Sequence, residues 1–166
     1  MDQRKRILIV VISLIVIVGV VLCVDYYRRQ MIGSQLPTGL PPGSIPIYVN
    51  GVYENSFMPD DLAQLESVSF VDAEEGKTQE GWLLRDVLEL YITADSLDAG
   101  TEVTVSSSSR EKSQTLTWPE IEKMENKVMF DLSGRGTLKL VSKIPGFDIR
   151  DTWVQDVDSI HVRTRK

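Results

Sequence analysis

The segment SFVDAEEGKTQEGWLLRDVLELY, residues 69–91, decides the fold class of this chain. It begins in a run typical of a strand, residues 67–72, and continues through an acidic loop that carries a glycine. Apolar residues then recur at helical spacing, at Leu84, Val87, Leu88 and Tyr91. This spacing predicts a short helix that buries one face. A strand, a loop and a helix in close succession indicate a domain that mixes α and β structure.

Strand patterns outnumber helix patterns in the rest of the chain. Strands are predicted at 45–49, 52–57, 101–109, 113–118, 128–132, 137–143 and 157–162. Asn50-Gly51 and residues 108–112 are typical of hairpin turns. Short helices are predicted at 59–65 and 119–124, the second because Thr117 and Glu120 form a capping-box pattern. The predicted class is α+β, a mixed and mostly antiparallel sheet with short helices against it.

Residues 7–24, ILIVVISLIVIVGVVLCV, form an uncharged run of 18 residues before this domain. At 1.5 Å per residue such a helix spans roughly 27 Å, close to the hydrocarbon thickness of a bilayer. We therefore expect a transmembrane anchor that contacts the lipid bilayer through this run. A cleaved signal peptide and a lipidated Cys23 are the alternatives. No A-x-A-like site follows the run, however, and Leu22 precedes the cysteine where a lipobox needs a small residue.

Charge around the run predicts its orientation. Three basic residues lie in the tail before it, whereas only Arg28 and Arg29 follow closely, with Asp25 beside them. The positive-inside rule then places the N-terminus in the cytoplasm and the domain outside a cell membrane that it crosses once. Residues 1–24 are thus read as tail and anchor, 25–44 as a stalk rich in proline and glycine, and 45–166 as the folded domain.

Composition excludes several classes of function. Residues 1–24 hold three of the 18 basic side chains and one of the 24 acidic ones, so the remainder carries about −8. A surface of that sign repels phosphate backbones, which argues against nucleic-acid binding. The single cysteine, Cys23, lies in the apolar run, so the domain has neither a disulfide nor a thiolate.

No local pattern predicts catalysis or a metal site. His161 stands alone in an alternating strand and is read as a packing residue. The serines at 106–109 have no base nearby and are read as a hairpin end. The pair Asp60-Asp61 suits a helix N-terminus, and the pair Glu74-Glu75 is read as a solvated loop. We therefore predict no catalytic residues and no metal ligands.

Four stretches, in order, resemble the oxidoreductase molybdopterin-binding domain, the sulfite-oxidase-like fold. They are IYVNGVYENSFMPDDLAQL (47–65), EGWLLRDVLELY (80–91), VTVSSSSREKSQTLTWPEI (103–121) and GRGTLKLVSKIPGFDIRDTWVQDVDSIHV (134–162). The second is similar to the family's W-x-G-x-x-L-x-D-L-L element, although Trp82 here follows the glycine. The resemblance covers about residues 45–162 and implies a molybdenum–pterin cofactor.

One feature of the family is missing from the matching region. In the family a cysteine after the strand ligates molybdenum, but residues 69–82, SFVDAEEGKTQEGW, contain none. A carboxylate cannot replace a soft thiolate without changing the site. The negative charge of the domain also disfavours an anionic phosphate cofactor. We therefore predict no bound cofactor, with molybdopterin implied by the resemblance alone.

Family analogy places a ligand site on three loops, at 74–82, at the serine-rich turn and at 143–153. The candidate ligand-binding residues are Glu74, Lys77, Trp82, Ser108, Arg110, Lys143, Arg150 and Trp153. The first hypothesis is an anchored, extracytoplasmic, non-catalytic module that binds a small molecule or a membrane protein partner. The alternatives are a molybdopterin-dependent oxidoreductase, an accessory subunit of a membrane redox complex, and an extracellular structural or assembly protein.

Overall fold

A computed structural model describes residues 17–20, 39–93 and 97–165. The chain divides into two units, residues 1–36 and 37–166. Of the predicted anchor only residues 17–20 are described, and these are helical; the rest of 7–24, and residues 25–38 of the predicted stalk, lie outside the described residues. Within the described ranges we find no helix with the length and hydropathy that a membrane crossing requires.

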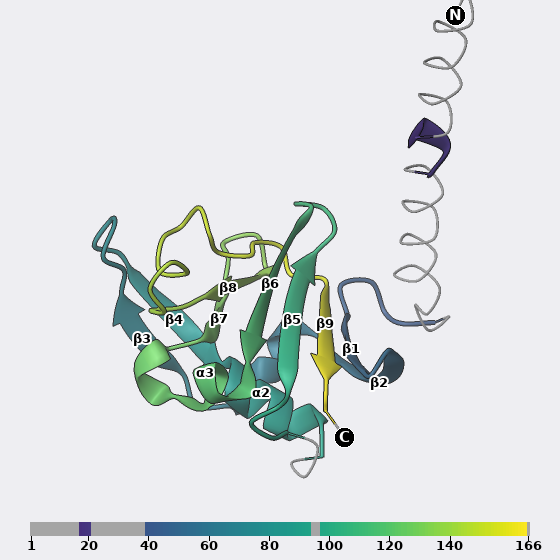
Figure 1. The fold of residues 1–166 in the computed structure, drawn as a ribbon. Coiled ribbons are helices and arrows are strands. Elements are labelled where there is room, and N and C mark those ends of the chain that lie inside the picture. Colours follow the sequence, from purple (N-terminus) through teal and green to yellow (C-terminus); the bar gives the residue numbers. More distant parts are fainter. Residues whose placement is uncertain (1–16, 21–38, 94–96, 166) are drawn as a thin grey trace, which may run out of the picture. The chain divides into compact units, whose positions relative to one another are not determined.

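The second unit contains a five-stranded mixed sheet in the order β2-β1-β9-β5-β6 (Figure 1). Its strands are β1 (Ile45–Val49), β2 (Val52–Phe57), β5 (Glu102–Ser107), β6 (Lys112–Thr117) and β9 (Ser159–Arg163). The pair β1–β9 is parallel and joins the two ends of the domain, whereas the other pairs are antiparallel. Asn50 and Gly51 both have positive φ, which is the geometry of a tight hairpin turn.

A second, antiparallel sheet has the order β3-β4-β7-β8. Its strands are β3 (Val68–Val71), β4 (Thr78–Leu83), β7 (Met129–Leu132) and β8 (Leu138–Val141). A single bridge between Leu140 and Val154 adds the long β8–β9 connection to its edge. This connection, residues 142–158, therefore runs beside the second sheet before the chain returns to the first.

The hydrophobic core is built from both sheets and from the helices. Ile47, Phe57 and Ile160 of the first sheet belong to the same buried cluster as Phe130 and Leu140 of the second. Helix α2 (Leu84–Tyr91) buries Leu84, Val87 and Leu88, the face that its spacing predicted. The shorter elements are η1 (Pro59–Gln64), α3 (Trp118–Glu122) and η3 (Met124–Asn126).

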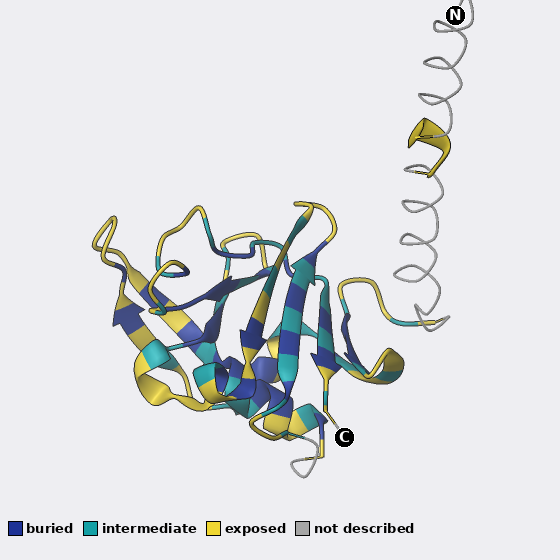
Figure 2. Ribbon diagram, viewed as in Figure 1, coloured by how far each residue is buried: buried dark blue, intermediate teal, exposed yellow. Residues whose placement is uncertain are grey.

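The helices lie at one end of this unit, and several of the connections between strands lie at the other (Figure 1). Figure 1 shows α2 and α3 at one end, and the β3–β4, β5–β6 and β7–β8 turns together with the β8–β9 connection at the other. The tips of these turns are exposed, and the strands that lead to them alternate between buried and less buried positions (Figure 2). We call this second end the loop end.

The α+β class and the predominance of antiparallel pairing are confirmed, but the strands form two sheets rather than the single one expected. The prediction that residues 74–82 form a loop is wrong in its second half, because β4 occupies Thr78–Leu83. Its inward positions are Gln79, Gly81 and Leu83, so only one of three carries an apolar side chain. The predicted capping box at Thr117 and Glu120 is confirmed, with the Thr117 amide donating to the Glu120 carboxylate over 2.8 Å.

Candidate functional site

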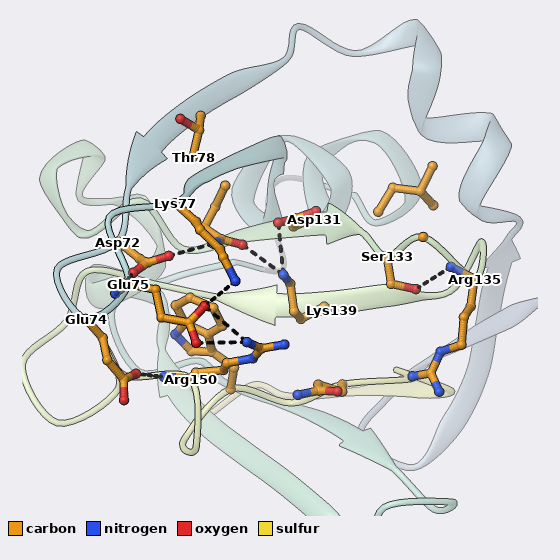
Figure 3. Close-up of a pocket in the computed structure, with 15 residues that line it drawn as sticks. Asp72, Glu74, Glu75, Lys77, Thr78, Asp131, Ser133, Arg135, Lys139 and Arg150 are labelled. Carbon is orange, nitrogen blue, oxygen red and sulfur yellow. Dashed lines mark hydrogen bonds and ion pairs between the residues drawn. The ribbon is translucent and has the colours of Figure 1, made fainter.

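A cleft of about 380 Å³ opens at the loop end. Its walls come from residues in 72–79, from residues 131–135 and Lys139, and from Arg150, Trp153 and Gln155 of the β8–β9 connection (Figure 3). Segments far apart in the sequence thus meet around one space. Their charged members are four acids and four bases, namely Asp72, Glu74, Glu75, Asp131, Lys77, Arg135, Lys139 and Arg150.

A chain of buried and half-buried polar side chains lines the cleft. The buried Asp72 carboxylate accepts a hydrogen bond of 2.9 Å from the Gln79 side-chain amide. The oxygen of that amide accepts a hydrogen bond of 2.8 Å from Lys139 Nζ, and Lys139 also pairs with Asp131 at 3.1 Å. Because each partner is satisfied, these side chains are held in place without a ligand.

The β3–β4 turn is shaped by Asp72. Its carboxylate accepts the Glu75 backbone N–H at 2.6 Å, its carbonyl accepts the Gly76 N–H at 3.2 Å, and Gly76 has a φ of 67°. The Glu75 N–H is the largest of the influences that hold the pKa of Asp72 below its ordinary value, and the Gln79 amide adds to it. The ionised Asp72 therefore fixes the turn that presents Glu74, Glu75 and Lys77.

The acidic tip of this turn binds the β8–β9 connection. The Glu74 carboxylate accepts the Arg150 backbone N–H at 3.0 Å, and both Glu75 oxygens lie 3.1 Å from Arg150 Nη1. Lys77 Nζ lies 2.6 Å from Glu75 Oε2, and Figure 3 shows Lys77 and Arg150 meeting at this one carboxylate. Lys77 and then Arg150 lower the pKa of Glu75. Glu74 and Glu75 therefore lie in an exposed turn, as predicted, and in addition both carboxylates bind the β8–β9 connection.

A second junction lies around Asp156. Arg110 from the β5–β6 turn contacts its carboxylate at 2.7 Å, and Arg135 from the β7–β8 turn contacts it at 2.9 Å. The Thr137 hydroxyl donates to it at 2.8 Å and is the first cause of a lowered pKa at Asp156, followed by Arg110. One carboxylate thus ties two turns to the β8–β9 connection.

Trp153 lies between the cleft and a neighbouring hollow of about 230 Å³, and it lines both. Its side chain is buried, with 2% of the residue exposed, and Lys139 Nζ lies 5.3 Å from the centre of its ring. Among the described residues its indole Nε1 has no hydrogen-bond partner. An indole N–H that is buried without an acceptor is costly, and among the described residues this is the one buried side-chain nitrogen or oxygen without a partner.

The sequence-predicted site residues fall into two groups. Glu74, Lys77, Arg150 and Trp153 line the cleft, and Arg110 lines the neighbouring hollow together with Arg150 and Trp153. The other three do not line either space. The Ser108 backbone N–H and hydroxyl bind Asp158, Trp82 borders a separate depression beside Ser67, and exposed Lys143 donates its backbone N–H to Asn126.

Sequence reasoning missed the residues beneath and beside the cleft. These are Asp72, Gln79, Asp131, Arg135, Lys139 and Asp156. One of them carried a signal, because Lys139 is a charged residue between the buried Leu138 and Leu140 of a predicted strand, whereas Gln79 lies in a stretch that was not predicted as a strand. Polar side chains at such positions need partners, which is the pattern that would have pointed to a buried network.

The lining of the cleft does not fit a molybdenum–pterin group. None of its residues carries sulfur, and each of its four cations is already paired with a carboxylate, Lys77 and Arg150 with Glu75, Arg135 with Asp156, and Lys139 with Asp131. Within the described residues no group of three or more histidine, cysteine or acidic side chains is arranged to hold a metal ion. The chemistry that this lining offers is hydrogen bonding and charge pairing with a small polar molecule.

Comparison with known proteins adds no family to this description. No protein-family model matches the chain, and no curated protein matches it.

Proposed function

We propose that this chain is a membrane-anchored, extracytoplasmic binding module without catalytic activity, and that its ligand binds in the loop-end cleft. The observation that carries the proposal is the cleft itself, a space of about 380 Å³ whose polar lining is held in place by internal hydrogen bonds and ion pairs. A volume in that range suits a small molecule. Preformed polar walls on a sheet scaffold favour binding, because little order has to be imposed when the ligand arrives.

The sequence supports the other parts of the proposal. The apolar run of residues 7–24 is the proposed single-pass anchor, with the N-terminus in the cytoplasm. The proposed fold relationship is to the sulfite-oxidase-like molybdopterin-binding domains, on the four stretches that resemble them. The loop that carries the molybdenum-ligating cysteine in that family carries Asp72, Glu74 and Glu75 here, which favours a binding role over the family's redox chemistry.

Hydrogen exchange of the full-length protein in detergent tests where the ligand binds. The protein is incubated with the small-molecule fraction of its own cells and compared with a buffer control. We expect slower exchange at 72–77, 133–137 and 148–156, the backbone that surrounds the cleft. Protection confined to the outer face of the five-stranded sheet, or no protection in any segment, would remove the cleft as the ligand site.

A further inference from the structure

Two cations at the rim of the cleft share one carboxylate. Lys77 and Arg150 both pair with Glu75, at 2.6 and 3.1 Å, and no other acid is paired with either of their side chains among the described residues. The Glu75 side chain is 37% exposed, whereas those of Lys77 and Arg150 are 64% and 54% exposed. This is a site at which a carboxylate already binds, through a bond that solvent can reach from outside.

A third donor, the indole N–H of Trp153, lines the same cleft. Trp153 follows Arg150 by three residues, and the Trp153 backbone N–H donates to the Arg150 carbonyl at 3.3 Å, so one turn carries both side chains. The indole N–H is buried, has no partner among the described residues and belongs to a side chain that lines the cleft. The cleft therefore offers an ammonium and a guanidinium at its rim and an unpartnered indole N–H in its buried lining.

We propose that a small organic acid binds here by placing its carboxylate where the Glu75 carboxylate lies and by accepting the Trp153 indole N–H as well. This inference rests on the proposed binding function of the cleft. Glu75 would then act as an internal competitor that turns toward solvent when the ligand binds.

The geometry favours a carboxylate over other anions. Both Glu75 oxygens contact Arg150 Nη1, and one of them also contacts Lys77 Nζ, so the two oxygens of one planar group satisfy both cations. A carboxylate offers about four acceptor positions, enough for these contacts and an indole N–H together. The carboxylate group that binds carries the same charge as the Glu75 carboxylate that it displaces, so Lys77 and Arg150 keep one carboxylate partner.

The indole N–H resonances of the full-length protein, labelled with ¹⁵N in detergent micelles, provide the direct readout. The chain has three tryptophans, and Trp153→Phe identifies the resonance of the third without removing its ring. Succinate is the probe, with its uncharged diamide and sodium chloride at equal ionic strength as controls. We expect a saturable shift of the Trp153 resonance with succinate, and none with either control.

Two substitutions at the rim should act in opposite directions. Arg150→Gln removes a cation and should weaken succinate binding about tenfold, whereas Glu75→Gln removes the competitor and should strengthen it about tenfold. The matched controls are Arg163→Gln and Glu54→Gln, which make the same charge changes at exposed positions outside the cleft. Both controls should leave the affinity within about twofold of wild type.

Three results would overturn this inference. They are an unmoved Trp153 resonance, an equal shift with sodium chloride, and a Glu75→Gln variant that binds no more tightly than its Glu54→Gln control. Each leaves the proposed function standing if hydrogen exchange still maps a ligand to the cleft. Protection that lies elsewhere would defeat the proposed function, whatever succinate does.

Discussion

At the scale of the residue, Gly81 shows why the decisive stretch has the sequence it has. It lies in β4 opposite Asp131 of β7. A Cβ built at Gly81 would stand 1.7 Å from the Phe130 carbonyl oxygen and 2.7 Å from the carbonyl carbon. Because both atoms are backbone, they cannot swing aside as a side chain would. The glycine therefore permits the close approach of two strands that form one wall of the cleft.

Gly81→Ala is accordingly predicted to lower the free energy of unfolding by about 3 kcal/mol, as overpacking in a dense interior does. For a domain of this size the melting temperature should fall by roughly 10 °C. Gly134→Ala is the matched control, because its Cβ meets no atom within 4 Å and its φ is not positive. Urea unfolding measures both variants. Equal stability of the two would contradict the close approach of β4 and β7.

Several individual contacts could not have been predicted from the sequence. Glu75 pairs with Arg150, which is 75 residues away, and Gln79 pairs with Lys139, which is 60 residues away. Nothing local to an acidic pair or to a strand lysine identifies such a partner. The presence of polar residues within strands indicates that partners exist, but only the fold shows which they are.

At the scale of the element, apolar spacing, turn residues and capping residues were predictive, whereas a strand with polar inward positions was not. The α2 face, both hairpin turns and the α3 capping box follow from spacing or turn chemistry, and the structure confirms them. Strand β4 was missed because it faces inward with Gln79 and Gly81, so period-2 alternation of hydrophobicity is absent. Its inward amide has buried partners in Asp72 and Lys139 instead of an apolar contact.

Two turns of the loop end, β5–β6 and β7–β8, are tied to Asp156, which has a φ of 54°. Asp156→Asn keeps a residue that tolerates this φ but removes the charge that Arg110 and Arg135 contact, and should cost about 1.5 kcal/mol. Asp156→Ala also strains the backbone and should cost about 1 kcal/mol more. Denaturant unfolding gives the two values. Asp151→Asn is the control. If Asp151→Asn lowers the free energy of unfolding as much as Asp156→Asn does, the role of Asp156 is refuted.

Low pH should remove the stabilisation that three carboxylates give to the loop end, within a defined range of pH. The pKa values of Asp72, Glu75 and Asp156 lie below their ordinary values of 3.8, 4.5 and 3.8 in the folded protein. Their stabilisation is therefore complete above those ordinary values and is lost as the pH falls through the lowered ones. Urea unfolding between pH 6 and pH 2.5 should show this loss, and Asp72→Asn should make it smaller. If the free energy of unfolding of Asp72→Asn falls with pH as steeply as that of the wild type, the assignment of this loss to Asp72 is contradicted.

His161 should contribute a separate step at higher pH. It stacks on Tyr48 with ring centres 4.8 Å apart, and burial lowers its pKa below the ordinary 6.5, against an opposing effect of Asp158. As the pH falls through 6.5 the unfolded chain takes up a proton that the folded protein resists, so stability declines until the lowered pKa is passed. His161→Gln should abolish this step while leaving the acid step intact. If the decline in stability below pH 6.5 persists in His161→Gln, it belongs to another group.

At the scale of the whole molecule, the α+β class was predictable but the division into two sheets was not. Strand count, short connections and hairpin signals give the class, and they leave open which hairpins share a sheet. The parallel pair β1–β9 joins residues 47–49 to 160–162, and no turn signal marks a contact at that separation. The meeting of the loop-end turns follows from this arrangement, although family analogy had indicated three of the segments involved.

The proposed membrane anchor makes a prediction at the same scale. Full-length protein should stay in the membrane pellet after carbonate extraction, because an uncharged, mostly apolar run of 18 residues cannot leave the bilayer at low cost. Protease added to intact cells should remove the domain. A variant that lacks residues 7–24 is the control for extraction. Release of the full-length protein would refute the anchor, and a protected domain would reverse its orientation.

The measurement that bears most directly on a binding module without redox chemistry is the molybdenum and pterin content of the full-length protein purified from its own cells. Metal analysis and pterin fluorescence, each expressed per chain, give the answer. We predict that both are far below one per chain in folded protein, because the cleft offers no thiolate and its cations are paired. Molybdenum and pterin at one per chain would contradict the proposal.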